Sequence, residues 1–111
     1  MLDEKSYRIR VNEVFARISK AFDAVDPDVV EAELSQGSLT LTTGGGKVKT
    51  ILSPQPSVRQ IWLAAAQQGL AVHFSFNEGQ GKWMDDKDRG FELFAFTQDV
   101  VKKAAGVDIV L

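Results

Sequence analysis

The chain has 111 residues, and its 13 Lys and Arg against 15 Asp and Glu give a formal net charge of −2. This length and a hydrophobic content of 44% are ordinary for one globular unit, so we predict a single domain over residues 1–111. The absence of cysteine excludes disulfides, thiolate metal sites and cysteine nucleophiles, and one histidine, His73, excludes sites that need two or three. The slightly acidic charge argues against a general nucleic-acid binder.

The first residues are acidic, with Asp3 and Glu4, unlike the basic start of a signal or transit peptide. Apolar runs in the sequence are much shorter than the roughly 20 residues that span a membrane. We therefore expect a cytoplasmic protein that does not associate with membranes, and the lack of cysteine agrees with a reducing compartment.

An amphipathic helix is predicted at the start of the chain. Its apolar residues recur at helical spacing on one face, and they are Tyr7, Val11, Val14, Phe15, Ile18, Phe22 and Val25. Asp3 is the expected N-cap. The helix should end at Asp26, because the residue before Pro27 avoids helical backbone.

From Asp28 onward the pattern changes to the two-residue alternation of strands separated by short turns. Six strands are predicted, at residues 30–35, 39–42, 47–52, 60–65, 72–77 and 82–85. The third should stop at Leu52, because a central strand would not hold Pro54 and Pro56. The run Gly44–Gly46 is expected to be a hairpin loop and not a phosphate-binding loop, since no Gly-Lys-Ser/Thr follows it.

A second helix is predicted from near Gly90 to Gly106, with apolar residues again at helical spacing. The order helix, strands, helix favours an α+β fold. We expect a two-layer αβ sandwich in which both helices cover one face of a six-stranded antiparallel sheet and the other face is open to solvent.

The open face carries the first candidate site. If Ile61 and Leu63 face the helices, then Gln60 and Trp62 point to solvent, because side chains alternate between the two faces of a sheet. By the same alternation, His73 on the next strand points to solvent as well. An exposed tryptophan is a typical anchor for a protein partner, because it supplies much contact area at low entropy cost. It can equally be a surface residue that covers its strand neighbours.

A second candidate is a group of acids at the end of the first helix and in the first strand. It consists of Asp23, Asp26, Asp28, Glu31 and Glu33. Carboxylates without histidine or cysteine hold a hard cation loosely, with water completing the coordination. The same residues could form a solvated acidic rim.

The common hydrolase, zinc-protease, nucleotide and dinucleotide motifs are missing from the sequence, which favours a non-enzymatic function.

The segment Gln60-Ile61-Trp62-Leu63-Ala64 resembles the Q-[IV]-W-L-[AS] signature of the frataxin family. Further matches follow in order over nearly the whole chain: Leu2-Asp3-Glu4 with Tyr7, residues 37–41, Gly81-Lys82-Trp83 and Gly90. The length is similar to that of the bacterial, CyaY-type members. Two departures stand out. Ser53 replaces the usual Asn, and the first helix is basic where many relatives are acidic, at Arg8, Arg10, Arg17 and Lys20.

The resemblance implies a non-enzymatic regulator of iron–sulfur cluster assembly that binds the cysteine desulfurase and the scaffold protein. It implies a partner-binding site at Gln60, Trp62, Ser53, Arg59 and His73. It also implies weak binding of iron, as Fe²⁺ or Fe³⁺, at Asp23, Asp26, Asp28, Glu31 and Glu33. Trp83 matches a second tryptophan of the family that is buried and structural. We expect a monomer.

Two alternatives stay open. Within the family, the chain could be an iron carrier or store, with ferroxidase-like activity in assembled forms and the acidic residues as its main site. Outside the family, a sheet platform with Trp62, Lys47, Lys49 and Arg59 could bind single-stranded nucleic acid, because aromatic rings on a basic sheet stack with bases.

Overall fold

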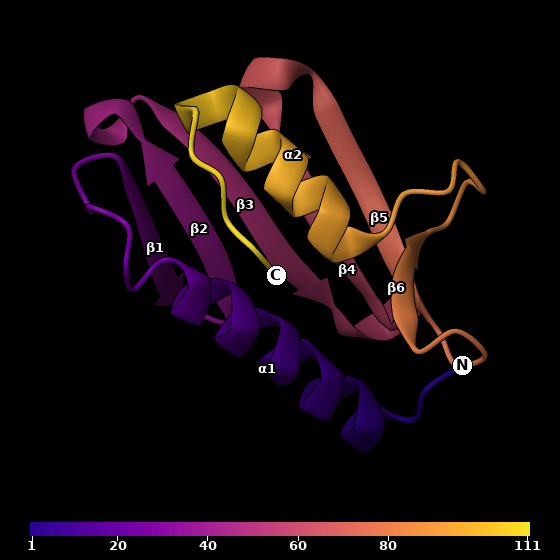
Figure 1. Cartoon of the computed structure of the whole chain (residues 1–111). Helices are drawn as coiled ribbons and strands as arrows, with labels where there is room; N and C mark the ends of the chain where they lie inside the picture. The colour runs from indigo at the N-terminus through magenta and orange to yellow at the C-terminus, as the bar shows by residue number, and fades with distance from the viewer.

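Figure 1 shows the computed structural model of the chain, which describes residues 1–111 with the exception of Gly45. Helix α1 spans Glu4–Ala21 and helix α2 spans Leu93–Ala105. The strands are β1 (Val30–Ser35), β2 (Ser38–Thr43), β3 (Val48–Gln55), β4 (Gln60–Ala65), β5 (Leu70–Asn77) and β6 (Lys82–Asp85). Short 3-10 turns connect the middle strands, and they are η1 (Gly44–Gly46), η2 (Pro56–Val58) and η3 (Ala66–Gln68).

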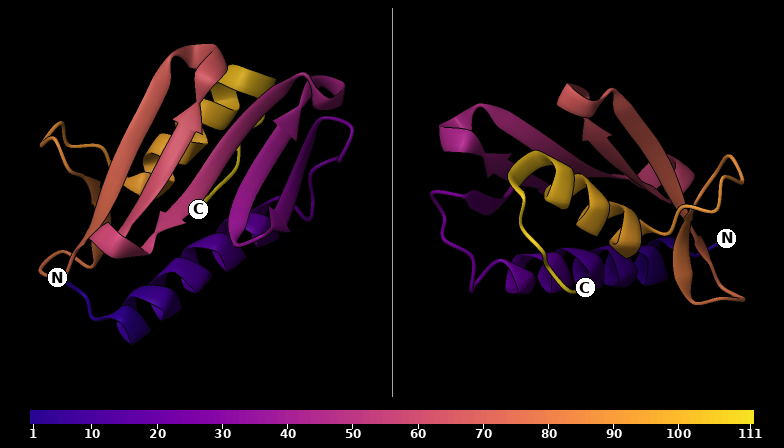
Figure 2. Two further views of the ribbon diagram at one scale, coloured as in Figure 1. Left: turned by 180° about the vertical axis from the view of Figure 1, so that it is seen from behind. Right: turned by 45° about the horizontal axis from the view of Figure 1, so that its top comes forward.

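The six strands form one antiparallel meander in the order β1-β2-β3-β4-β5-β6, so every strand pairs with its neighbour in the sequence. Both helices lie against the same face of this sheet (Figure 1). Seen from behind, the strands stand in front and the helices lie beyond them (Figure 2). The predicted α+β, two-layer αβ sandwich is thereby confirmed.

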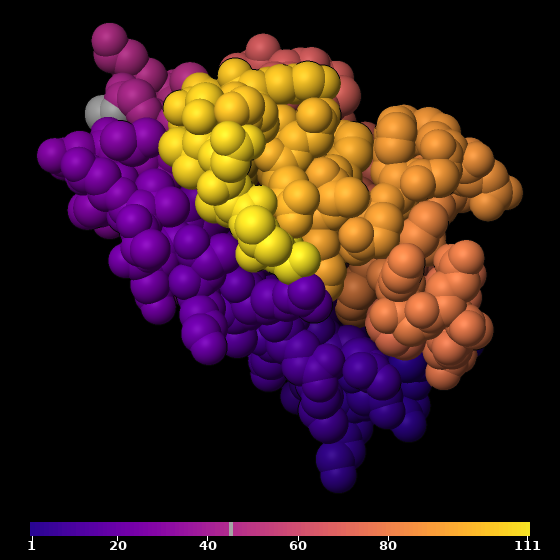
Figure 3. All heavy atoms as spheres, in the orientation of Figure 1, coloured from indigo at the N-terminus to yellow at the C-terminus, as the bar shows by residue number. Residues whose placement is uncertain are grey.

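The core lies between the helices and one face of the sheet. Its fully buried side chains come from α1, all the inner strands and α2, and the largest are Tyr7, Ile18, Leu39, Leu41, Leu52, Ile61, Leu63, Phe74 and Leu93. Burying each large apolar side chain contributes roughly 1.5–3 kcal/mol. The C-terminal tail lies between the two helices (Figure 3), where Ile109 is also buried.

Helix α1 starts as predicted and ends five residues earlier than expected, at Ala21 instead of Asp26. Asp3 is the N-cap, and its carboxylate accepts a hydrogen bond from the Ser6 N–H at 2.7 Å. The helix stops at Ala21, after which the chain continues in tighter turns, with the Val25 N–H donating to the Phe22 carbonyl at 3.0 Å. Phe22 is still buried and Val25 half-buried, so the apolar spacing persists beyond the helix.

The prediction that β3 stops at Leu52 is wrong, because β3 continues through Pro54 to Gln55. In the described pairing, β2 accompanies β3 only as far as Leu52, which pairs with Leu39. Pro54 therefore pairs with Ile61 of β4 on one side and lies at a local edge of the sheet on the other. Proline is tolerated at an edge, because its missing N–H costs no ladder hydrogen bond there.

Helix α2 begins at Leu93 and not near Gly90, because a buried carboxylate holds the preceding loop in a different conformation. Asp85 accepts hydrogen bonds from the backbone N–H groups of Lys87, Arg89 and Phe91 at 3.0–3.1 Å. The Arg89 Nε–H donates to the same carboxylate at 3.1 Å. Burial raises the pKa of Asp85, but these hydrogen bonds together lower it below its usual value of 3.8.

We predict that Asp85→Asn lowers the melting temperature at pH 7 and that the deficit shrinks on acidification. The pKa of Asp85 is lower in the folded protein than in the unfolded chain, where it has its usual value of 3.8. Ionised Asp85 therefore stabilises the fold above pH 3.8. That contribution is lost as the pH falls through the folded pKa. Thermal melts from pH 3 to pH 7 test this, with Asp88→Asn in the same loop as the control. A deficit that is equal at both ends of the range would contradict the prediction.

Candidate functional site

The face of the sheet that turns away from the helices, here called the open face, carries the tryptophan singled out in the sequence. In β4, Ile61 and Leu63 are buried in the core, whereas Gln60 and Trp62 lie half-buried on the open face. The prediction that Ile61 and Leu63 face the helices while Gln60 and Trp62 face away from them is confirmed.

The strand register places Trp62 between two other candidate residues. Trp62 pairs with Ser53 of β3 on one side and with His73 of β5 on the other. The rings of Trp62 and His73 stack, with centroids 4.1 Å apart and planes inclined by 12°. Three predicted partner-binding residues therefore lie in one row across three strands.

Gln60 connects this row to a residue that the sequence analysis missed. The indole Nε1–H of Trp62 donates to Gln60 Oε1 at 2.8 Å. Gln60 Nε2 donates in turn to Ser75 Oγ at 3.1 Å and to Asp86 Oδ2 at 3.2 Å. The same Asp86 oxygen lies 3.7 Å from His73 Nδ1. Gln60, Trp62, His73, Ser75 and Asp86 form one contiguous polar and aromatic cluster, here called the Trp62 cluster.

Asp86 follows the last residue of β6, and only the strand register brings it beside His73. Asp85 pairs with Phe74 and is buried, so the next residue emerges on the open face. The Asp86 N–H then donates to the His73 carbonyl at 2.9 Å. The sequence carries a signal for this position only in the alternation of buried Trp83 and Asp85.

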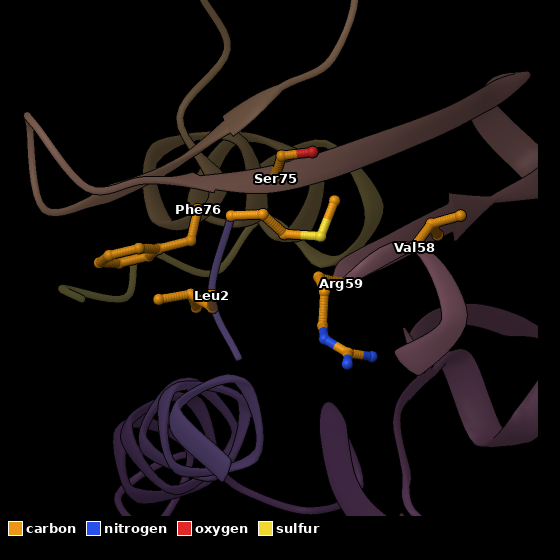
Figure 4. A pocket seen from close by; sticks show the side chains of 6 residues that line it. Leu2, Val58, Arg59, Ser75 and Phe76 are labelled. Carbon is orange, nitrogen blue, oxygen red and sulfur yellow. The ribbon is translucent and has the colours of Figure 1, made fainter. Parts of the chain in front are cut away.

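Arg59 is not brought into the Trp62 cluster. It adopts a left-handed backbone conformation, with φ 54°, directly after η2. Its guanidinium donates to the Pro56 carbonyl and lies 5.9 Å from the Tyr7 ring, on the helix side of the sheet. Figure 4 shows the Arg59 side chain directed away from Ser75, at a small hollow of about 120 Å³.

The predicted iron-binding acids, here called the acidic group, are all exposed. Asp23 and Glu31 border one shallow hollow of about 240 Å³ between the end of α1 and β1. The Asp26 carboxylate accepts a hydrogen bond from the Asp28 N–H at 2.9 Å within the connecting turn. In the part of the chain that the structure describes, no three Asp, Glu or His side chains gather closely enough to hold a metal ion. A preformed coordination shell is therefore missing from these residues.

A six-stranded antiparallel sheet with two helices on one face and a clustered tryptophan on the other defines a small, open-faced α+β sandwich protein. Residues 1–107 match the frataxin-like domain, and the chain belongs to the frataxin family. In the described residues, neither helix has the long apolar stretch that crossing a membrane requires.

Related proteins span almost the whole chain. It is 34% identical to the iron-sulfur cluster assembly protein CyaY of Pseudomonas fluorescens (strain Pf0-1), over 96% of this chain and 93% of that protein. It is 33% identical to the protein of the same name from Paraburkholderia phymatum, over 95% and 93% of the two chains. The solved frataxin of Psychromonas ingrahamii has the same fold, with a TM-score of 0.83 and 22% identity over 97% of this chain and 96% of that one.

Proposed function

We propose that this chain is a non-enzymatic factor of iron–sulfur cluster assembly that binds its protein partners through the open face. The observation that carries the proposal is the position of Trp62, which stands half-buried on the uncovered side of the sheet and outside the core. The names of the related CyaY proteins support the process in which it acts.

The surroundings of Trp62 have the character of a protein interface. Ile51 is 38% exposed, and Ala64 and Ala71 are exposed on the same face, so small and apolar side chains border the indole. Gln60 and His73 supply hydrogen-bonding groups beside them. An apolar centre with an aromatic anchor and a polar rim is typical of protein–protein interfaces. The proposed partner is the complex of the cysteine desulfurase with the scaffold protein.

This function is tested by titrating the ¹⁵N-labelled protein with the desulfurase–scaffold complex and following its NMR resonances. We expect the signals of Ile51, Trp62 and His73 to weaken first, because they would lie in the interface. Signals on the outer side of α2, such as those of Asp99 and Lys103, should persist longer. Losses that begin on α2 and spare the open face would contradict the proposed function.

We further propose that the acidic group binds iron weakly, as cargo. The observation that favours it is the hollow shared by Asp23 and Glu31. Carboxylates bind hard cations, but without a closed donor set the ion keeps most of its water. Attraction at roughly 4–8 Å in a surface dielectric amounts to only a few kcal/mol and is screened by salt.

In an NMR titration with iron, we predict that paramagnetic broadening begins at residues 23–33 and reaches His73 later. The double variant Asp23→Asn, Glu31→Gln should reduce the broadening, and Asp99→Asn on α2 should not. Broadening that starts at His73 and Trp62 would contradict this assignment. If carrying or storing iron were the main function, the double variant would impair cluster assembly more than Trp62→Ala.

A further inference from the structure

We propose that Asp86 is the positioning residue of the open face and that it fixes the orientation of the Trp62 indole through Gln60. The importance of this orientation for partner binding rests on the proposed function above. The orientation itself is a property of the free protein and can be tested there.

The Gln60 side chain uses both ends of its amide within the Trp62 cluster. Its Oε1 accepts from the Trp62 indole N–H at 2.8 Å, and its Nε2 donates to Ser75 Oγ and Asp86 Oδ2. An amide can turn by 180° and exchange its oxygen for its nitrogen. If the Gln60 amide turned, its NH₂ would face the indole N–H, and two donors would oppose each other.

Besides the indole itself, which can only donate, Asp86 is the one hydrogen-bonding neighbour of the Gln60 amide among the described residues that favours a single orientation. The Ser75 hydroxyl can donate or accept, so it tolerates either end of the amide. An ionised carboxylate only accepts, so Asp86 requires the amide nitrogen on its side. The amide oxygen is then left for the indole of Trp62. A charge-assisted hydrogen bond of this kind is also stronger than a neutral one.

The same Asp86 oxygen acts on the other side of the indole as well. It lies 3.7 Å from Nδ1 of His73, whose ring stacks on the face of Trp62. One carboxylate oxygen therefore contacts both the amide at the edge of the indole and the imidazole on its face. Apart from Trp62 itself, no other side chain of the Trp62 cluster contacts both of these groups in the described residues.

Asp86 is held firmly enough for this role. Its N–H donates to the His73 carbonyl at 2.9 Å, which ties it to the neighbouring strand. The preceding residue, Asp85, is buried and bonded to three backbone N–H groups of the following loop. The backbone on both sides of Asp86 is thus restrained, and its carboxylate is presented at a defined point of the open face.

The test uses Asp86→Asn, which keeps the size of the side chain but can donate as well as accept. In this variant the Gln60 amide loses its charge-assisted, acceptor-only partner, and the indole N–H alone still favours the wild-type orientation. We expect the Trp62 indole N–H to shift upfield in the ¹H–¹⁵N spectrum and to exchange with solvent about five-fold faster, the loss of roughly one net hydrogen bond. Trp62→Phe assigns the signal. The exposed Asp88→Asn removes the same charge from the same loop and should leave the signal in place.

Two further variants separate positioning from general damage. Asp86→Glu keeps an acceptor-only group and should restore much of the wild-type indole signal. Ser75→Ala removes the other partner of the Gln60 amide and should preserve the indole hydrogen bond. The proposal is overturned if the indole signal of Asp86→Asn equals that of the wild type, or if Ser75→Ala disturbs it to the same extent.

Binding of the desulfurase–scaffold complex then distinguishes the positioning role of Asp86 from the proposed function of the open face. An altered indole signal together with about five-fold weaker binding supports both the positioning role and the proposed function. An altered signal with unchanged binding supports the positioning role of Asp86 and counts against the open face as the partner site.

Discussion

Replacing Trp83 with alanine should destabilise the protein by about 3–5 kcal/mol, which is the usual effect of removing a buried aromatic ring. Trp83 lies on β6 and is only 3% exposed. Its ring makes edge contacts with Tyr7 of α1, at 6.2 Å between centroids, and with Phe76 of β5, at 5.5 Å. One side chain thus joins the last strand, its neighbour and the first helix.

The loss is large for a domain of this size, whose total stability is typically about 5–15 kcal/mol. Thermal or urea unfolding monitored by circular dichroism measures it. Ile9→Ala, which shortens an exposed apolar side chain on α1, is the control and should change the stability little. A Trp83→Ala variant that melts within a few degrees of the wild type would show that the ring does not support the core.

The second large effect is expected on binding. Trp62→Ala should leave the fold nearly intact and weaken binding to the desulfurase–scaffold complex about thirty-fold or more, since tryptophan hot spots contribute 2 kcal/mol or more. The fold should persist because Trp62 lies outside the core between the sheet and the helices. The partner would lose both the indole surface and the pre-arranged stack with His73.

Calorimetric titration of wild-type and variant proteins with the complex measures this change. Ile9→Ala is again the matched control, because it removes exposed apolar surface on α1 and should bind normally. Trp62→Phe, which keeps an aromatic ring but loses the hydrogen bond to Gln60, should fall between the wild type and alanine. Unchanged affinity in Trp62→Ala would remove the main support of the proposed function, and a collapsed melt would assign Trp62 to the structure.

The helices and strands could be predicted from local patterns in the sequence. The helical spacing that begins at Tyr7, the alternation around Ile61 and the turn at Gln36-Gly37 each depend on neighbouring residues. Both turn residues have positive φ, 53° and 81°, as a two-residue hairpin between twisted strands requires. Such local signals predicted six strands, two helices and the outward direction of Trp62.

The predicted end of β3 and the predicted start of α2 were wrong because a distant part of the chain changed the local conformational preference there. Pro54 remains in β3 because β2 has already ended beside it, and the length of a neighbouring strand is not visible from the proline. The start of α2 moves to Leu93 because the buried Asp85 binds the backbone of the preceding loop. In both cases hydrogen bonding outside the element decided its boundary.

The candidate site, like the fold, could be predicted only in part from the sequence. The sequence alone determined that Gln60 and Trp62 share one face of a strand, because side chains alternate along a strand. Only the tertiary structure stacked His73 on Trp62, added Asp86 to the cluster and placed Arg59 on the helix side, over Tyr7. The physical reason is that alternation is a property of a single strand, whereas register relates strands and loops and is set by the pairing of the whole sheet.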